Sequence, residues 1–393
     1  MSSRDRHRSQ ARPTAQTRRM RAAAEREEAL RARGAAQGSE TTTIRAVRER
    51  RPLPLKRIAQ LVLLATLAIV VVGAVLIWQR VSSFNAQVSD ASTMSSALFG
   101  PLGGKDRVNV VMIGYAGEEK HGGTYLADSI NILSIDPATD TTTVVPIPRD
   151  LWIEGAPEMP SNGKVNEAFA LGWRRGGVEE AGAAVARVLT RVTGLKIEHW
   201  MAIDFAGFRE MVDAVGGVTI NNPRAFSYTW SEQNFHNRRW DGGSFKKGTL
   251  HLNGKLALDY ARTRYTSVPA ESSDFARSVR QQRILAALKG KLGSGGLSSI
   301  GPGLSLMDAL AGRLKTDLSA FDLFLLSSHL NADRRVELKE DVILRAGRSS
   351  AGQYILIVIG RSSPTDYTPL HAWLAEQLAK PIPSASASPA KGG

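Results

Sequence analysis

Residues 58–78 constrain this chain more than any other segment. They read IAQLVLLATLAIVVVGAVLIW, with no charged side chain and with Gln60 as the one strongly polar residue. About 20 apolar residues in a helix cross a hydrocarbon layer about 30 Å thick. A cleavable signal peptide has a shorter apolar region near its start, whereas 57 residues precede this one. The sequence therefore predicts a single retained transmembrane helix.

Basic charge is concentrated before this segment. Residues 1–57 contain 16 Lys and Arg against 6 Asp and Glu, which is +10 of the formal net charge of +14. The positive-inside rule therefore predicts a cytoplasmic tail, disordered or partly helical, and an extracytoplasmic remainder. The tail has no Phe, Tyr or Trp on which bases could stack, so nucleic acid is disfavoured as a partner and the anionic surface of the cytoplasmic membrane is favoured.

Several enzyme classes are excluded by what the chain lacks. It has no cysteine, which excludes disulfides, thiolate catalysis and cysteine zinc sites. It also has no His-Glu-x-x-His, Gly-x-Ser-x-Gly or Walker-type phosphate loop. Readings as a zinc protease, a serine esterase or a P-loop enzyme therefore find no support.

Composition divides the rest of the chain into three parts. Residues 79–104 are polar and then rich in Gly and Pro, which predicts a stalk. Residues 105–380 have the pattern of one folded domain, and residues 381–393 are rich in Pro, Ser and Ala, which predicts a disordered tail.

The domain alternates between short β-branched runs and helical periodicity. Strands are predicted at 108–113, 130–135, 142–147, 199–204, 336–344 and 353–359, and helices at 165–173, 178–192, 205–215, 253–260, 275–292, 304–314, 319–330 and 367–378. This alternation predicts an α/β fold. Residues 221–247 are aromatic and Arg-rich without periodicity, which is typical of a functional loop.

Arginines recur at positions predicted to be structured, namely Arg149, Arg262, Arg264, Arg277, Arg280 and Arg283. Guanidinium forks suit phosphate and pyrophosphate oxygens. In an extended chain Arg262 and Arg264 point to the same side, and on a helix Arg277, Arg280 and Gln281 share a face. The alternative is equally open: these arginines form a solvated face, or pair with Asp259, Glu271 and Asp274 to brace the fold.

Two carboxylates stand at predicted strand ends. Asp128 comes directly before the second strand and Asp150 directly after the third, where α/β proteins gather their ligands. Such carboxylates can hold Mg²⁺ beside a phosphate. The alternatives are that Asp128 is a turn or capping residue and that Asp150 pairs with Arg149.

Ordered motifs along residues 107–292 resemble the LytR-CpsA-Psr family. The earlier ones are Ala127-Asp128-Ser129-Ile130, Asp136-Pro137, Pro148-Arg149-Asp150, Lys164-Val165-Asn166-Glu167-Ala168-Phe169, and Phe208 followed by Asp213-Ala214-Val215-Gly216-Gly217-Val218. The later ones are Leu252-Asn253-Gly254, Ala257-Leu258-Asp259-Tyr260-Ala261-Arg262-Thr263-Arg264, Ser273-Asp274-Phe275-Ala276-Arg277 and Arg280-Gln281-Gln282-Arg283.

This resemblance implies an α-β-α sandwich with a central mixed sheet, outside the membrane. It implies a metal-dependent phosphotransferase that moves a glycopolymer phosphate from a polyprenyl (undecaprenyl-type) pyrophosphate carrier to peptidoglycan, with Mg²⁺ or Mn²⁺. By position, Asp128 would bind the metal. Arg149, Arg262, Arg264, Arg277 and Gln281 would hold the pyrophosphate, with Arg280 as an additional member. Asp274 would support the arginines or act as a base, and Arg149 would also serve in catalysis.

The chain departs from the family pattern at Ile113-Gly114-Tyr115-Ala116, where many members carry an acidic residue soon after the glycine. The second metal ligand is then Asp150 or a neighbour such as Glu118, Glu119 or His121. The family's lipid tunnel is also open, because Phe169, Trp173, Trp200, Phe208 and Met211 suit an ordinary core equally well.

Two other functions fit the same residues. A polyprenyl pyrophosphate hydrolase would use the same metal and arginines with water as the nucleophile. A non-catalytic envelope regulator or wall-glycan binder would instead depend on its basic tail.

Overall fold

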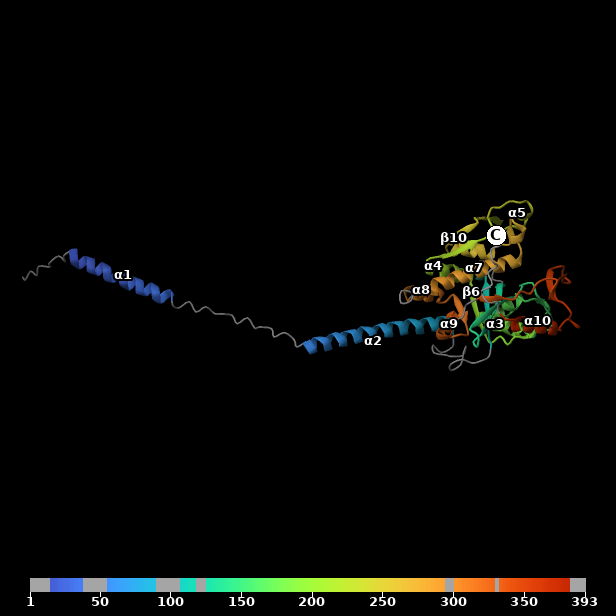
Figure 1. Cartoon of the computed structure of the whole chain (residues 1–393), viewed down its shortest axis with the longest axis horizontal. Helices are drawn as coiled ribbons and strands as arrows, with labels where there is room; N and C mark the ends of the chain where they lie inside the picture. Colours follow the sequence, from blue (N-terminus) through green and yellow to red (C-terminus); the bar gives the residue numbers. More distant parts are fainter. Residues whose placement is uncertain are drawn as a thin grey trace, which may run out of the picture. The chain divides into compact units, whose positions relative to one another are not determined.

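The computed structural model describes residues 15–37, 55–89, 107–117, 125–293, 300–328 and 332–381 of the chain (Figure 1). It divides into two compact units, Met1–Val70 and Val71–Gly393. The first unit contains α1 (Ala15–Gln37) and the beginning of α2 (Leu55–Val88), and the second contains all the other elements. The predicted C-terminal tail lies outside the described residues beyond Pro381.

Helix α2 covers the predicted membrane span. In the part of the chain that the structure describes, no helix combines the length and the apolar character needed to cross a membrane. The side chains of residues 58–65 and 67–69 are not among those described, so the span at 58–78 stays a prediction.

The stalk at 79–104 stays a prediction, and its first part is helical because α2 continues to Val88. The last turns of α2 pack on the larger unit: Phe84 and Val88 are buried beside Leu314, and Asn85 Oδ1 accepts a hydrogen bond of 2.7 Å from the Ala320 amide. These contacts explain why the polar sequence is helical here. Residues 90–104 lie outside the described residues.

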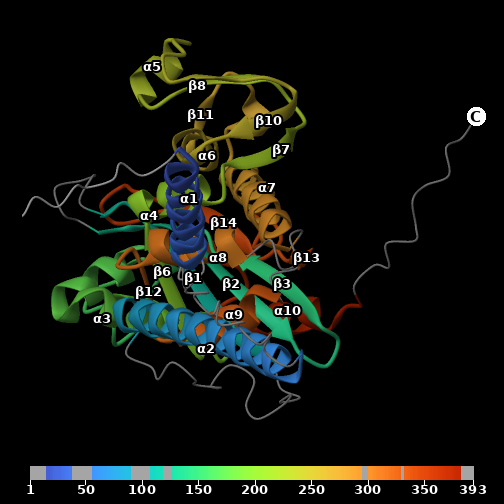
Figure 2. The same ribbon diagram turned by 90° about the vertical axis from the view of Figure 1, so that its left-hand side faces the viewer.

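A mixed sheet of six strands forms the centre of the larger unit, in the order β12-β6-β1-β2-β3-β13 (Figure 2). Its strands are β1 (Val108–Tyr115), β2 (Ala127–Asp136), β3 (Thr141–Pro146), β6 (His199–Asp204), β12 (Leu314–Thr316) and β13 (Ala332–Arg335). β2 runs antiparallel to β1 and β3, whereas β6 is parallel to β1 and β13 is parallel to β3. The predicted strands at 108–113, 130–135, 142–147 and 199–204 are confirmed as members of one mixed sheet.

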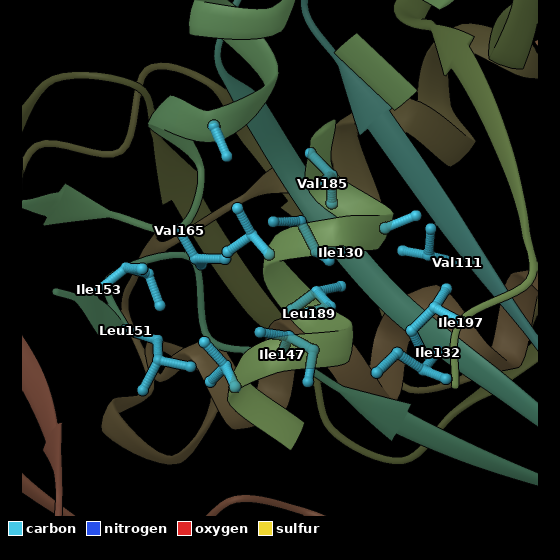
Figure 3. Packing of buried hydrophobic residues seen from close by; sticks show 14 of the residues in the cluster. Val111, Ile130, Ile132, Ile147, Leu151, Ile153, Val165, Val185, Leu189 and Ile197 are labelled. Carbon is cyan, nitrogen blue, oxygen red and sulfur yellow. The ribbon is translucent and has the colours of Figure 1, made fainter. Parts of the chain in front are cut away.

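Helices cover both faces of this sheet, because alternate residues of each strand point to opposite sides. On one face, Val111 and Ile132 pack against α3 (Glu167–Thr193) in a core that also includes α10 (Thr368–Ala379) (Figure 3). On the other face, Val110 and Leu133 pack against Leu326 of α9 (Ala320–Ser328). The predicted α/β fold with a central mixed sheet is therefore confirmed.

A second hydrophobic core lies to one side of the large sheet (Figure 2). Val212, Tyr260 and Ile284 bring together α4 (Phe205–Ala214), α6 (Gly254–Arg262) and α7 (Asp274–Gly293). Small strands cover this core: β7 (Val218–Asn222) with β10 (Gly248–Leu252), and β8 (Phe226–Thr229) with β9 (Gly243–Phe245) and β11 (Tyr265–Thr266).

The shorter elements complete the unit. They are β4 (Trp152–Ile153), β5 (Gly163–Lys164), α5 (Glu232–His236), the 3₁₀ turn η3 (Pro269–Glu271), α8 (Ile300–Leu310), β14 (Leu344–Arg348) and β15 (Tyr354–Val358).

Two sequence predictions about elements need correction, and a third is confirmed. Residues 221–247 are not one loop, since they contain β8, α5 and β9, whose aromatic side chains pack on each other. The predicted strand at 336–344 is displaced: the chain forms β13 before it and β14 from Leu344 onward. The helices predicted at 165–173 and 178–192 are confirmed as the two parts of α3, which a kink with non-helical backbone at Gly176 and Gly177 separates.

Arg280 of α7 fixes the chain that follows α6. Its side chain is fully buried. Nε donates to the Tyr260 carbonyl (2.8 Å) and Nη2 to the Thr263 carbonyl (2.5 Å). Nη1 donates to both the carbonyl (2.8 Å) and the carboxylate (3.0 Å) of Glu271. Burial lowers the pKa of the guanidinium, and Glu271 counteracts this. One guanidinium thus ties residues 260–271 to α7.

We predict that Arg280→Lys lowers the free energy of unfolding by about 2–4 kcal/mol, because buried carbonyls lose their donors at about 1–3 kcal/mol each while the charge beside Glu271 is kept. A single ammonium cannot reproduce the fork that reaches three carbonyls and a carboxylate. Chemical denaturation of the full chain measures the change. The matched control is Arg283→Lys, which loses only one hydrogen bond, to the Tyr260 hydroxyl (3.1 Å). Equal losses in the two variants would contradict the bracing role.

Candidate functional site

The candidate site lies at the sheet edge where β1, β3 and β6 end and β2 begins. The strand register places Tyr115 of β1 beside both Ala127 of β2 and Asp204 of β6. Because β2 is antiparallel to β3, the residues that follow β3 come to the start of β2. Arg149 and Asp128 meet there, with Nη1 3.4 Å from the carboxylate Oδ1. Their side chains are about one-quarter and one-fifth exposed, so solvent and ligands can reach this pair.

Asp150 faces cations rather than open space. Lys164 Nζ lies 2.6 Å from its Oδ1, and Arg149 Nε lies 3.6 Å from its Oδ2. The residue is buried. The predicted role of Asp150 as a metal ligand therefore does not fit this geometry, since both oxygens already balance protein cations. The alternative, a structural partner of Arg149, fits it.

The backbone of Asn166 links the start of β2 to the segment that follows β3. Its carbonyl accepts from the Ala127 amide (3.3 Å), and its amide donates to the Arg149 carbonyl (3.4 Å). Its side-chain Oδ1 is buried, and no hydrogen-bond partner for it is present in the described part of the chain. Asn166 therefore brings an unsatisfied oxygen acceptor to the segments that carry Asp128 and Arg149.

The opposite wall comes from the end of α6 and from β11. The guanidinium carbon of Arg262 lies 4.0 Å from the centre of the Phe205 ring and 5.3 Å from that of Trp230. Burial raises the pKa of the Tyr265 hydroxyl, and Glu232 adds to the rise, whereas Arg264 and Arg149 oppose it. Both Arg264 and Arg149 thus lower this pKa, although they lie 115 positions apart in the chain.

Helix α7 closes the site from a third direction. Gln281 Oε1 accepts from Ser129 Oγ (3.0 Å), and its Nε2 donates to the Ala261 carbonyl (3.4 Å). Arg277 is partly exposed on the same helix. The side chain of Asp274 lies outside the described residues, so its predicted role is untested.

The prediction that Arg280 binds a phosphate does not fit the structure. Its guanidinium is fully buried and holds the Tyr260, Thr263 and Glu271 carbonyls. The bracing alternative fits Arg280, whose carboxylate partner is Glu271.

The oxygen donors at this edge fit a hard divalent cation held largely by its substrate. Mg²⁺ usually takes one or two protein carboxylates and fills its other positions with water and phosphate oxygens. Asp128 would supply one carboxylate to such an ion, and Asn166 Oδ1, which has no hydrogen-bond partner in the described chain, would be a further oxygen donor. In the described chain, no three His, Cys, Asp or Glu side chains form a metal-binding group. Glu118, Glu119 and His121 lie outside the described residues.

The sequence missed several residues that the structure brings to the site. Lys164 and Ser129 stood inside quoted motifs, but without a role, because only the fold shows that they contact Asp150 and Gln281. Trp230 and Tyr265 lie beside site arginines through strand pairing of β8 with β11. The aromatic content of 221–247 was the one available signal.

The aromatic residues considered for a lipid tunnel belong to packed clusters. Phe169 and Trp200 are buried in the main core, with Trp173 packed against it, and Phe208 and Met211 pack on the second core. Trp173 stacks on Tyr125, with ring centres 3.9 Å apart. The tunnel stays a prediction.

Comparison with known proteins agrees with the fold. The profile of the LytR_cpsA_psr family matches residues 78–363. The polyisoprenyl-teichoic acid–peptidoglycan teichoic acid transferase TagU of Oceanobacillus iheyensis is 30% identical over 60% of this chain and 67% of its own. TagU of Bacillus subtilis is 26% identical over 76% of this chain and 90% of its own.

A crystal structure of protein gbs0355 from Streptococcus agalactiae superposes with a TM-score of 0.54 at 20% identity, covering 75% of this chain and 93% of that one. At this identity the superposition shows the shared fold alone. The family match extends over most of the chain and includes every site segment described above. The chain belongs to the LytR_cpsA_psr family.

Proposed function

We propose that this chain moves a glycopolymer phosphate from a polyprenyl pyrophosphate carrier to peptidoglycan. One observation carries the proposal: Arg149 lies 3.4 Å from the Asp128 carboxylate at the sheet edge, and α7, which bears Arg277, reaches the same edge through the hydrogen bond from Ser129 to Gln281. Guanidinium groups that converge from separate segments suit the two phosphates of a pyrophosphate. The names of the TagU relatives, which combine a polyisoprenyl-linked polymer with peptidoglycan, support the same chemistry.

The proposed reaction is an in-line displacement at the phosphorus next to the glycan. A hydroxyl of the acceptor sugar forms the new O–P bond, and the bond from that phosphorus to the bridging oxygen breaks. Polyprenyl phosphate leaves, a phosphodiester remains, and a base takes the hydroxyl proton. Asp274 is the base we predict. Phosphoryl transfer depends mainly on positioning and charge neutralisation, which Arg149, Arg262 and Arg264 would supply.

A Mg²⁺ or Mn²⁺ ion remains part of the proposal. When bound, it would act as a Lewis acid that neutralises phosphate oxygens. Asp128 is the carboxylate that would hold it, with Asn166 Oδ1 as a neutral oxygen donor. Asp150 would act indirectly, because it holds Lys164 and Arg149 in place.

The proposed location is the outer side of the cytoplasmic membrane, with α2 as the anchor. Along α2, large apolar side chains between Val70 and Trp78 are about half exposed or more. An apolar surface of this kind is costly in water and suits contact with lipid. The basic residues before α2 favour a cytoplasmic N-terminus.

We predict that Arg262→Ala and Arg264→Ala each lower the rate of transfer at least about 100-fold, since each removes a charge that stabilises the transition state. The assay follows acceptor-linked glycan by mass spectrometry after incubation with a synthetic polyprenyl-pyrophosphate glycan and peptidoglycan fragments. Arg187→Ala is the matched control, because Arg187 is half exposed on α3 and pairs with Glu158 and Glu180. Transfer rates within threefold of the parent chain for both site variants would contradict the proposal.

We also predict that EDTA abolishes product formation and that Asp128→Asn raises the half-saturating Mg²⁺ concentration about tenfold or more, because it removes the anionic ligand. Asp150→Asn is the comparison variant: it should lower the unfolding free energy with little change in Mg²⁺ dependence, since it leaves the partly buried Lys164 beside a neutral amide. A Mg²⁺ requirement shifted by Asp150→Asn and not by Asp128→Asn would reverse the assignment.

The same assay separates the other two functions. Free phosphorylated glycan in the presence of acceptor would indicate the hydrolase. Loss of function on deletion of residues 2–50, without any turnover by the full chain, would indicate the regulator.

A further inference from the structure

Trp230 presents an apolar ring at the rim of the site. It follows β8 directly and is 46% exposed, whereas most large apolar residues of the folded unit are buried. Its ring lies 5.3 Å from the Arg262 guanidinium carbon, which packs on Phe205 from another side. An exposed tryptophan beside a phosphate-binding arginine offers a flat surface next to the place where the phosphate would bind.

Contacts of the neighbouring Tyr228 hold the Trp230 ring in place. Tyr228 packs edge-on against it, with ring centres 5.3 Å apart, and the Tyr228 hydroxyl donates to Asp259 Oδ2 (3.3 Å). Gly242 donates its amide to the Tyr228 carbonyl (2.9 Å), and a Cβ at Gly242 would come within 2.6 Å of the Tyr228 ring. The strand below Trp230 therefore cannot shift without breaking several contacts.

Asp241 fixes the chain on the far side of Trp230. Its Oδ1 accepts from Thr229 Oγ1 (2.6 Å) and its Oδ2 from Asn234 Nδ2 (2.7 Å). The Thr229 hydrogen bond is the main reason that the pKa of Asp241 is lowered, so the carboxylate stays ionised and able to accept both bonds. The Asp241 carboxylate thus binds both Thr229, which precedes Trp230, and Asn234 of α5, which follows it.

We propose that Trp230 is a stacking platform for the pyranose ring next to the phosphate, and this rests on the proposed function. One face of a pyranose carries several C–H groups, which pack on an aromatic ring, while the phosphate bonded to that sugar would reach Arg262. Aromatic rings contribute binding energy through apolar area at low entropic cost because their side chains have few rotamers. The ring belongs either to the first sugar of the glycopolymer or to the acceptor sugar.

The first experiment measures binding to the full chain in detergent with three probes: a phosphate-free peptidoglycan disaccharide, a sugar 1-diphosphate, and inorganic pyrophosphate. Trp230→Ala should weaken the saccharide that occupies the platform about tenfold, the scale of one aromatic stacking contact. Pyrophosphate binding should stay within twofold. Weaker binding of the disaccharide would show that Trp230 stacks on the acceptor sugar. Weaker binding of the sugar diphosphate would show that it stacks on the first sugar of the glycopolymer.

Three results would overturn the platform. They are unchanged binding of both saccharides, failure of the parent chain to bind either saccharide, and an equal loss for pyrophosphate, which would mean that Trp230 acts only through Arg262. Trp230→Phe should keep most of the affinity because a ring remains. Val342→Ala, at another exposed apolar residue, should change nothing. Because no turnover is needed, this outcome is independent of the transfer assay.

Asp241→Ala should weaken the same saccharide as Trp230→Ala, since it releases the chain on both sides of the ring. A role in general stability predicts additive losses in the double variant. A positioning role predicts that the double variant binds no more weakly than Trp230→Ala alone, because the platform is already gone. Additive losses would remove Asp241 from the proposal and leave Trp230 to stand on its own measurement.

Discussion

The site depends on one buried guanidinium that binds no ligand. Arg280 holds carbonyls of Tyr260, Thr263 and Glu271, so the chain that bears Arg262 and Arg264 has a single conformation against α7. A buried charge is costly unless every donor is matched. That cost is also what makes the arrangement specific, because any displacement of the segment would leave a charge or a carbonyl without a partner in the interior.

A second feature of the site is the set of contacts that orient its arginines. Two carboxylates lie near Arg149. Asp150 is buried and paired with Lys164, whereas Asp128 is more exposed and lies 3.4 Å from Arg149. Arg262 contacts the faces of Phe205 and Trp230, which attract a cation without neutralising it. These contacts fix the direction of each guanidinium at the site.

The sequence predicted most strands of the central sheet and the segments that carry the site, because both depend on short-range sequence patterns. β-branched runs identified four strands of the central sheet, and their ends singled out Asp128 and Asp150, which the structure places on either side of Arg149. It could not separate Arg280 from Arg277, since helical spacing says that two residues share a face but not which one points into the interior. It also missed β12 and β13, which are short and take their strand form from pairing with distant partners.

The aromatic residues of 221–247 also show that local sequence patterns miss structure that depends on distant contacts. Without periodicity they read as a loop, yet Phe226, Tyr228 and Phe245 pack on each other and on Tyr260 of α6. Their order is tertiary, set by a sheet whose strand β11 lies beyond α6 in the chain. This is why the segment can place an exposed Trp230 accurately while still lacking any local signature of structure.

Transfer to a sugar hydroxyl must compete with water, which is present at far higher concentration than any wall glycan. Arginines and a metal ion activate the phosphorus toward either nucleophile, so they cannot by themselves select the acceptor. Selection requires that the acceptor be held in line, where effective concentrations can reach about 10⁵ M or more. A rigid aromatic surface beside the phosphate supplies such positioning for a saccharide and none for water. If Trp230 holds the acceptor, the choice between transferase and hydrolase lies in the β8–α5 segment rather than in the residues that contact the phosphate.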